Sequence, residues 1–176
     1  MVIATGFFDG VHLGHRFVIS RLVQAARERG DQSMIVTFWP HPRTVLQNGA
    51  RNLRLLTSLD EKKALLKSLG VDRVEIIPFS KDFSRLSTEE YLRTVLIDRF
   101  DAKAILLGYD NRMGNSPSSP EEIQALAEKI GLEVIRTDSI STGLGTVISS
   151  TQIRNALMEG NISLASEMLG YDYSLH

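Results

Sequence analysis

The chain has 176 residues, of which 43% are apolar and 23% charged, a mixture that predicts one globular domain and not a disordered segment. Its 20 Lys and Arg against 21 Asp and Glu give a formal net charge of −1, which argues against a dedicated nucleic-acid-binding protein. The sequence has no cysteine, so disulfides, thiolate nucleophiles and zinc ribbons are excluded, and its apolar runs are too short to span a membrane.

Short apolar strands alternate with amphipathic helices along the chain. Strands are expected over residues 2–5, 34–38, 74–77, 104–107 and 133–137, and helices over 14–29, 58–69, 87–100, 119–130, 149–159 and 163–169. Five such alternations predict an α/β fold, with a five-stranded, mainly parallel sheet covered by helices on both faces. Ligands of such sheets bind beyond the carboxyl ends of the strands, so the loops after Thr5, Phe38 and Gly108 and the helix starting at Ser149 are candidate site segments.

The loop after the first strand reads F-D-G-V-H-L-G-H over residues 8–15. His12 and His15 are three residues apart and share a face on a helical turn, and Gly14 lets a ligand approach the backbone. The start of the following helix supplies free N–H groups and the positive end of a dipole. Two imidazoles beside a helix start favour a polyphosphate site, with a pair of surface histidines as the alternative. A catalytic zinc site would need a third ligand besides the two histidines. The sequence lacks the G-x-S-x-G, P-loop and G-x-G-x-x-G patterns, which argues against a Ser-His-Asp hydrolase, a P-loop kinase and a dinucleotide-dependent oxidoreductase.

A second cluster reads S-S-T-Q-I-R over residues 149–154. Ser149 and Gln152 are spaced as a helix cap, and an ordinary capped helix is the alternative interpretation. Ser150 and Thr151 place hydroxyl groups in the first turn, and Arg154 lies one turn further on with a guanidinium group suited to phosphate. We therefore expect this helix start and the histidine turn to converge on one triphosphate.

Two loops are candidates for an aromatic ligand. Trp39 and His41 follow the second strand within F-W-P-H-P and can stack on a ring system, although Trp39 is equally compatible with a place in the core. The second loop, residues 108–114, is polar and bounded by glycines, which suits a ligand or a plain surface turn.

Together these motifs resemble the adenylyltransferase module of the prokaryotic bifunctional riboflavin kinase/FMN adenylyltransferases, often called FAD synthetases, within the HIGH-type nucleotidyltransferases. The resemblance covers nearly the whole chain and includes P-H-P at residues 40–42 and L-G-Y at residues 169–171. It implies a Rossmann-like three-layer α/β/α fold, one FMN adenylyltransferase domain over residues 1–176 and a cytoplasmic location. The riboflavin kinase module would be absent from this chain, which would then be either a part of a longer parent chain or a stand-alone form. The implied partners are small molecules, and neither nucleic acid nor membrane.

The implied reaction joins FMN and ATP, with Mg²⁺, to give FAD and pyrophosphate. The resemblance assigns catalytic roles to His12, His15 and Arg154, ATP binding to Gly6, Phe7, Asp9, Gly14, Ser150 and Thr151, and FMN binding to His41, Pro42, Asp110 and Asn111. No residue is assigned as a metal ligand. Family members usually carry aromatic residues where Asn111 and Met113 stand, so the flavin side departs from the pattern. The alternatives are another phosphorylated acceptor, such as phosphopantetheine or nicotinamide mononucleotide, and a non-catalytic nucleotide-binding domain.

Overall fold

The computed structural model describes residues 1–46, 53–108, 113–115, 118–137 and 148–173. Its centre is a five-stranded sheet in the order β3-β2-β1-β4-β5, and every strand pair is parallel. The strands are β1 (Val2–Thr5), β2 (Ser33–Trp39), β3 (Arg73–Pro78), β4 (Ala104–Leu107) and β5 (Glu133–Arg136). The predicted parallel sheet is therefore confirmed, with each strand within about a residue of its expected bounds.

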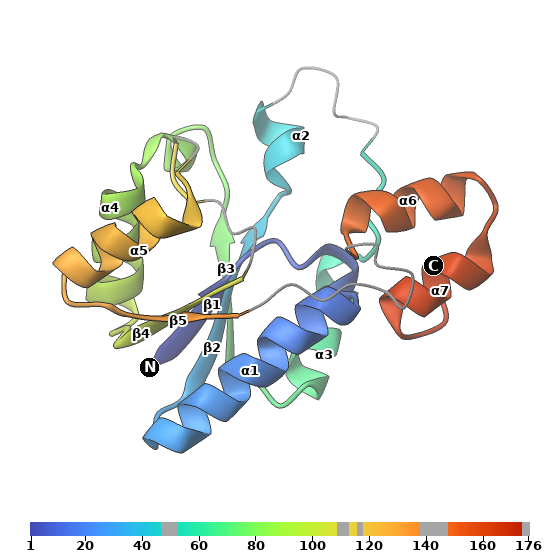
Figure 1. The fold of residues 1–176 in the computed structure, drawn as a ribbon. Coiled ribbons are helices and arrows are strands. Elements are labelled where there is room, and N and C mark those ends of the chain that lie inside the picture. The colour runs from blue at the N-terminus through green and yellow to red at the C-terminus, as the bar shows by residue number, and fades with distance from the viewer. Residues whose placement is uncertain (47–52, 109–112, 116–117, 138–147, 174–176) are drawn as a thin grey trace.

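Helices cover both faces of this sheet, which explains why the central strands are continuously apolar. All four residues of β1 and of β4 are buried. Figure 1 shows α1 (Leu13–Arg29) and α3 (Leu59–Ser68) on one face, and α4 (Thr88–Glu90), η4 (Tyr91–Arg99) and α5 (Pro120–Lys129) on the other. Each face has its own apolar core, so the predicted three-layer α/β/α arrangement is confirmed.

Several helices begin as their sequences predict. The side chains of Ser58, Ser87 and Ser119 each accept a hydrogen bond from a backbone N–H three residues on. The side chain of the glutamate there accepts one from the backbone N–H of the serine, which completes a capping box. Helix α1 ends at Gly30, which adopts a left-handed φ of 64° that favours glycine. Local capping chemistry thus sets where these elements start and stop.

Two elements differ from expectation. The helix expected over residues 87–100 is α-helical only in α4 and continues as the π-helix η4, whose wider turn lets Tyr91, Leu92, Val95 and Leu96 all face the core. The loop after the second strand, for which no helix is expected, contains α2 (Pro42–Leu46), because proline is well accommodated at the first position of a helix. Short 3-10 turns, η1 (Asp9–Val11) and η3 (Phe83–Arg85), lie in the connections that follow β1 and β3.

The last two helices lie beyond the carboxyl ends of the strands. Helices α6 (Ser150–Met158) and α7 (Ile162–Leu169) pack on each other around a third apolar cluster that includes Ile153, Ala165 and Leu169. Figure 1 places this pair beside the start of α1, at the end of the sheet where β1 leads into the histidine-bearing turn. In the described residues no helix is long and apolar enough to cross a membrane.

Candidate nucleotide site

The turn between β1 and α1, residues 6–12, has an unusual backbone. Phe8 and Val11 adopt positive φ angles of 50° and 38°, and Gly10 a φ of 78°. A non-glycine residue held at positive φ costs about 1–3 kcal/mol and persists only where its surroundings fix it. The turn lies after β1, the strand that β2 and β4 flank, where the strand order reverses and α/β sheets bind ligands.

Side chains from distant segments hold this turn in place. Ser150 Oγ donates to the carbonyl of Asp9 at 2.9 Å, and the Tyr171 hydroxyl donates to the carbonyl of Gly10 at 2.7 Å. The backbone N–H of Gly10 donates to Thr57 Oγ1 at 3.2 Å. The segment before α3, the start of α6 and the chain after α7 therefore all meet the strained backbone.

The two histidines stack on each other at the start of α1. His12 is the N-cap, because its Nδ1 accepts a hydrogen bond from the His15 N–H at 3.3 Å, and the two ring centroids are 3.6 Å apart at 17°. A Cβ added at Gly14 would lie 3.2 Å from two atoms of the His12 ring, so glycine is what allows this close approach. Among the described residues, His15 Nδ1 is buried without a hydrogen-bond partner.

Burial keeps these imidazoles neutral. It lowers the pKa of His12 to about 4, with the positive charge of Arg154 acting in the same direction. The pKa of His15 falls well below its usual value because the ring is desolvated, and His12 and Lys62 add to the effect. At neutral pH the pair therefore offers uncharged N–H donors. A phosphate brought beside the rings would favour protonation, since an opposite charge nearby stabilises the charged form.

Arg154 reaches the turn through a buried ion pair with Asp9. The two atoms, Arg154 Nη1 and Asp9 Oδ2, are 2.6 Å apart, and the side chains are 13% and 8% exposed. Asp9 Oδ1 accepts the backbone N–H groups of Leu56 at 2.9 Å and Thr57 at 3.3 Å. The carboxylate that was expected to line the nucleotide is thus engaged by its own chain, and it orients the guanidinium group beside the histidines.

The remaining expected ATP-binding residues surround the same turn. Gly6 donates its N–H to the carbonyl of Val36 at 3.1 Å and lies just before the strained backbone. Ser149 caps α6 as expected, Ser150 is used to anchor Asp9, and Thr151 is exposed in the first turn of the helix. The histidine turn and the start of α6 are therefore brought together, as the sequence predicts.

The expected flavin side is described only in part. The His41 ring lies 5.1 Å from the Phe7 ring, and its Nδ1 accepts the N–H of Arg43 at 3.2 Å. Burial lowers the pKa of His41 to about 4, aided by nearby cationic side chains. Pro42 begins α2, whereas Asp110 and Asn111 lie outside the described residues.

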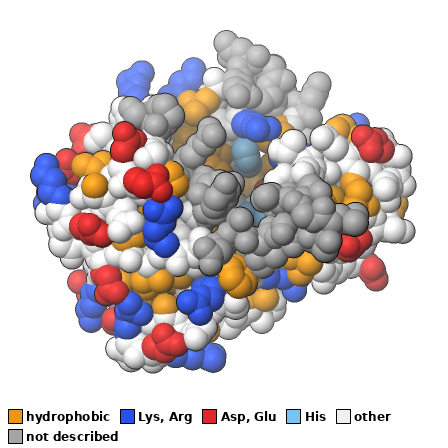
Figure 2. Space-filling view, viewed as in Figure 1, with side chains coloured by type: hydrophobic (Ala, Val, Ile, Leu, Met, Phe, Trp, Pro, Cys, Tyr) orange, Lys and Arg blue, Asp and Glu red, His pale blue; other side chains and the backbone are white. Residues whose placement is uncertain are grey.

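A narrow recess joins the turn to the carboxyl end of β2. Its lining residues come from the turn, from the end of β2 and the loop after it, and from α3 and the segment before it: Phe7, Asp9, Phe38, Trp39, His41, Leu55, Thr57 and Lys62. Trp39, half-buried, borders this recess, with its ring centroid 5.8 Å from Lys62 Nζ. Figure 2 shows histidine side chains at the bottom of a hollow near the centre of the face drawn.

Thr57, Lys62 and Tyr171 take part in this arrangement but were not predicted as site residues. Lys62 carries a signal in the sequence, because a lysine stands on the apolar stripe of α3 between Leu59 and Leu66, and Tyr171 belongs to the L-G-Y motif of residues 169–171. Thr57 and Tyr171 act through contacts that span 47 and 161 positions of the chain. No local pattern reports such contacts.

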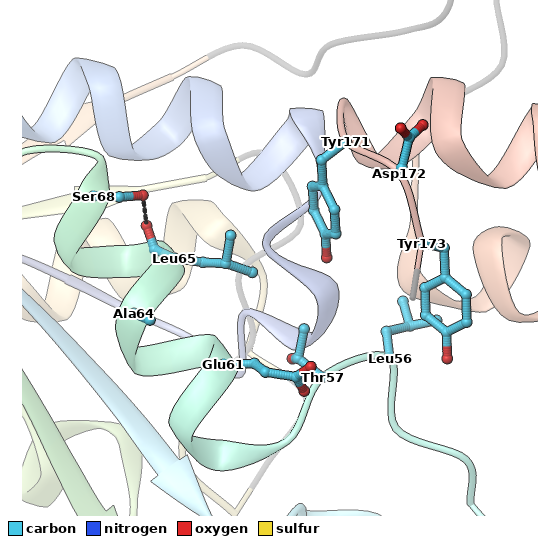
Figure 3. Close-up of a pocket in the computed structure, with 9 residues that line it drawn as sticks. All are labelled: Leu56, Thr57, Glu61, Ala64, Leu65, Ser68, Tyr171, Asp172 and Tyr173. Atoms are coloured by element: carbon cyan, nitrogen blue, oxygen red, sulfur yellow. Dashed lines mark hydrogen bonds between the residues drawn. The ribbon is translucent and has the colours of Figure 1, made fainter. Parts of the chain in front are cut away.

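A larger cavity of about 400 Å³ lies on the other side of the segment before α3. Figure 3 shows residues of α3 facing the aromatic rings that follow α7 across it. Its lining residues are Leu56, Thr57, Glu61, Ala64, Leu65, Ser68, Tyr171, Asp172 and Tyr173. It contains none of the predicted site residues, but Thr57 borders both this cavity and the recess.

The parallel sheet, with the histidine turn at its switch point and the start of α6 beside that turn, is the arrangement of an α/β nucleotide-binding domain. Comparison with known proteins gives the family. The FAD synthetase family matches residues 1–152, and the chain belongs to that family.

Relatives in several bacteria are bifunctional riboflavin kinase/FMN adenylyltransferases. That of Listeria monocytogenes is 36% identical over 173 residues, covering 98% of this chain and 54% of the relative. That of Escherichia coli is 32% identical over 178 residues, covering 99% of this chain and 55% of the relative. The chain therefore spans about half the length of the curated relatives it matches.

Solved structures agree on the fold. A Streptococcus pneumoniae structure named a macrolide-efflux protein superposes with a TM-score of 0.87 at 29% identity, over 97% of this chain and 55% of the other. The pantothenate synthetase of Thermus thermophilus superposes with a TM-score of 0.56 at 13% identity, over 96% of this chain and 74% of the other, which shows a shared fold alone.

Proposed function

We propose that this domain transfers AMP from ATP to FMN, giving FAD and pyrophosphate. The observation that carries the proposal is the meeting of the stacked histidines with Arg154 at one turn, in a chain of the FAD synthetase family. His12, His15 and Arg154 are the proposed catalytic residues. Gly6, Phe7, Gly14, Ser150 and Thr151 are proposed to border ATP, and His41, Pro42, Asp110 and Asn111 to border FMN. Asp9 is proposed to act on ATP through Arg154.

The proposed transfer of AMP requires that the two substrates be positioned and that the charge on the leaving pyrophosphate be stabilised. An oxygen of the FMN phosphate attacks the α-phosphorus of ATP in line with the departing pyrophosphate, and because that oxygen is already anionic no general base is needed. The imidazole N–H groups, the guanidinium of Arg154 and the amides at the start of α6 offer donors to the charge that develops on the leaving group. No covalent nucleophile is required.

Magnesium is proposed to enter with the nucleotide. Among the described residues no three His, Asp or Glu side chains cluster as a metal site, and the carboxylate of Asp9 is engaged by Arg154 and two backbone N–H groups. The residues present fit an ion held by phosphate oxygens, which Mg²⁺ commonly uses together with water. Bound there, the ion would neutralise phosphate charge.

The remaining parts of the proposal concern the context of the domain. Residues 1–176 are proposed to form one adenylyltransferase domain without riboflavin kinase activity of their own. The relatives carry a kinase function in a chain nearly twice as long, so a kinase module in a parent chain is the proposed partner. The cytoplasm is the proposed compartment, in keeping with the absence of cysteine.

A direct assay tests the activity. The protein is incubated with ATP, Mg²⁺ and FMN, with riboflavin, phosphopantetheine and nicotinamide mononucleotide as comparison acceptors, and products are separated by chromatography. We expect a product, FAD, with FMN as the acceptor and none with the three comparison acceptors. A product with another acceptor would show that this acceptor, and not FMN, is the substrate. ATP binding without pyrophosphate release for any acceptor would indicate a non-catalytic domain.

The variant His15→Ala tests the role of the histidine pair. Removing one donor that stabilises developing charge typically costs about 10²–10³ in rate, and we expect that loss in FAD formation. Arg21→Ala, an exposed change on the same helix, is the matched control and should keep the wild-type rate. A folded His15→Ala protein with a near-normal rate would contradict the assignment.

A further inference from the structure

Lys62 is a buried cation in the first half of α3. Its side chain belongs to a residue only 5% exposed, on the face that the helix turns toward the sheet. Burying an ammonium group is costly unless hydrogen bonds replace its water, and a leucine such as Leu66 fills a similar face of the same helix without that cost. The presence of a lysine there therefore calls for an explanation.

The ammonium group has three acceptors for its three hydrogens. Nζ lies 3.1 Å from the carbonyl oxygen of Phe7, 3.3 Å from Thr37 Oγ1 and 3.5 Å from the carbonyl oxygen of Phe38. Thr37 Oγ1 in turn donates to the Phe7 carbonyl at 3.2 Å. Lys62 thus joins the backbone after β1 to the carboxyl end of β2 from a third element, α3.

The Phe7 carbonyl is where the chain enters the strained turn. The next residue, Phe8, has a positive φ, and four residues further on His12 caps α1. Ser150 and Tyr171 fasten the middle of the turn, whereas Lys62 and Thr37 fasten its entry. The entry and the middle of the turn are therefore held by different elements.

We propose that Lys62 is a positioning residue for the adenylyl transfer proposed above, which fixes the Phe7 carbonyl and thereby the entry of the chain into the histidine turn. The inference rests on the proposed function for its effect on rate. Lys62 does not touch the reacting atoms, since its donors are all used by the chain. It acts through the placement of His12 and His15.

The positive charge of Lys62 also affects the pKa values of nearby histidines. Its field contributes to the lowered pKa values of His15 and His41, and the negative charge of Asp9 partly offsets the effect of burial on the pKa of Lys62 itself. Replacing Lys62 with a neutral side chain should therefore raise the pKa of both imidazoles. This effect follows from the charge of Lys62 alone and does not depend on its hydrogen bonds.

The experiment compares Lys62→Met, which keeps length without charge, with Lys62→Arg, which keeps charge but changes the donor geometry. Lys67→Met, an exposed change on the same helix, is the control. Steady-state FAD formation gives kcat and KM, ATP binding is measured without FMN, and NMR follows the histidine titrations. Misplacing a site by about 1 Å can cost about 10² in rate, so kcat of Lys62→Met should fall about 10²-fold with KM within about 3-fold.

We expect Lys62→Arg to keep the wild-type histidine titrations and to lose about 10-fold in kcat, since a planar guanidinium does not match three acceptors around one nitrogen. A folded Lys62→Met protein with wild-type kcat would overturn the proposal. Should the Met variant not fold, a wild-type kcat in Lys62→Arg would do so. If the wild-type protein makes no FAD, the proposed function has failed. The NMR signals of the stacked His12 and His15 rings, compared at a pH where both are neutral, then decide the role of Lys62: signals unchanged in Lys62→Met would overturn it.

Discussion

The protonation of His12 offers a quantitative test of the site. Burial lowers its pKa from 6.5 in the unfolded chain to about 4 in the folded protein. Between these two values the unfolded chain binds a proton that the folded protein does not, so folding stability must fall as the pH is lowered. Over this span of about 2.5 pH units the loss is about 3 kcal/mol, at about 1.4 kcal/mol for each unit.

His12→Asn isolates this contribution. Asparagine keeps an oxygen that can accept the His15 N–H at the helix cap, but it does not titrate. Urea unfolding of both proteins at pH 7.5 and at pH 4 gives the comparison. With a slope of about 2 kcal/mol per molar urea, the midpoint of the wild type should fall about 1.5 M further than that of the variant.

The measurement at pH 7.5 serves as its own control, because His12 is then neutral in both states and the two proteins should differ by no more than about 1 kcal/mol. Parallel declines of the two midpoints with falling pH would refute the reasoning. They would mean that the His12 ring titrates in the folded protein as it does in the unfolded chain.

Two further predictions concern the backbone of the turn. Gly10→Ala should lower the free energy of unfolding in urea by more than about 2 kcal/mol, because the added Cβ would lie 2.7 Å from the Leu56 side chain at a φ of 78°. Gly30→Ala has a similar φ but no atom near the added Cβ, and it should lower this free energy by about 1 kcal/mol. Equal losses in the two variants would contradict the steric contact with Leu56. Tyr171→Phe should cost about 1 kcal/mol in the same assay by removing the hydrogen bond to the Gly10 carbonyl, while Tyr173→Phe should cost less; no difference between them would show that this bond contributes nothing.

The sequence is sufficient to predict most of the fold, since its signals are local. Serine and glutamate three residues apart mark three helix starts, and Gly30 marks the end of α1. Near-continuous apolar strands separated by helices leave a covered parallel sheet as the arrangement that buries them. The π-helical η4 was not predictable in this way, because its widened turn depends on which side chains the neighbouring core accepts.

In the site, too, the residues in local motifs were predictable and those that depend on long-range contacts were not. The histidine pair and the start of α6 were predicted, since each is a short run of residues whose chemistry is evident on its own. The role of Asp9 was not, because its carboxylate is paired with a guanidinium 145 positions away and with backbone N–H groups that only the fold brings near. The anchoring role of Lys62 likewise depends on a carbonyl 55 positions away.

The way the turn is fastened has a consequence for biosynthesis on the ribosome. The histidines emerge early, but Ser150, Arg154 and Tyr171, which secure the backbone around them, are translated more than 130 residues later. A nascent chain can pair its first strands well before it can hold a strained loop at their end. The competent arrangement therefore forms late, and a chain released before its final helices would carry the histidines without the contacts that aim them.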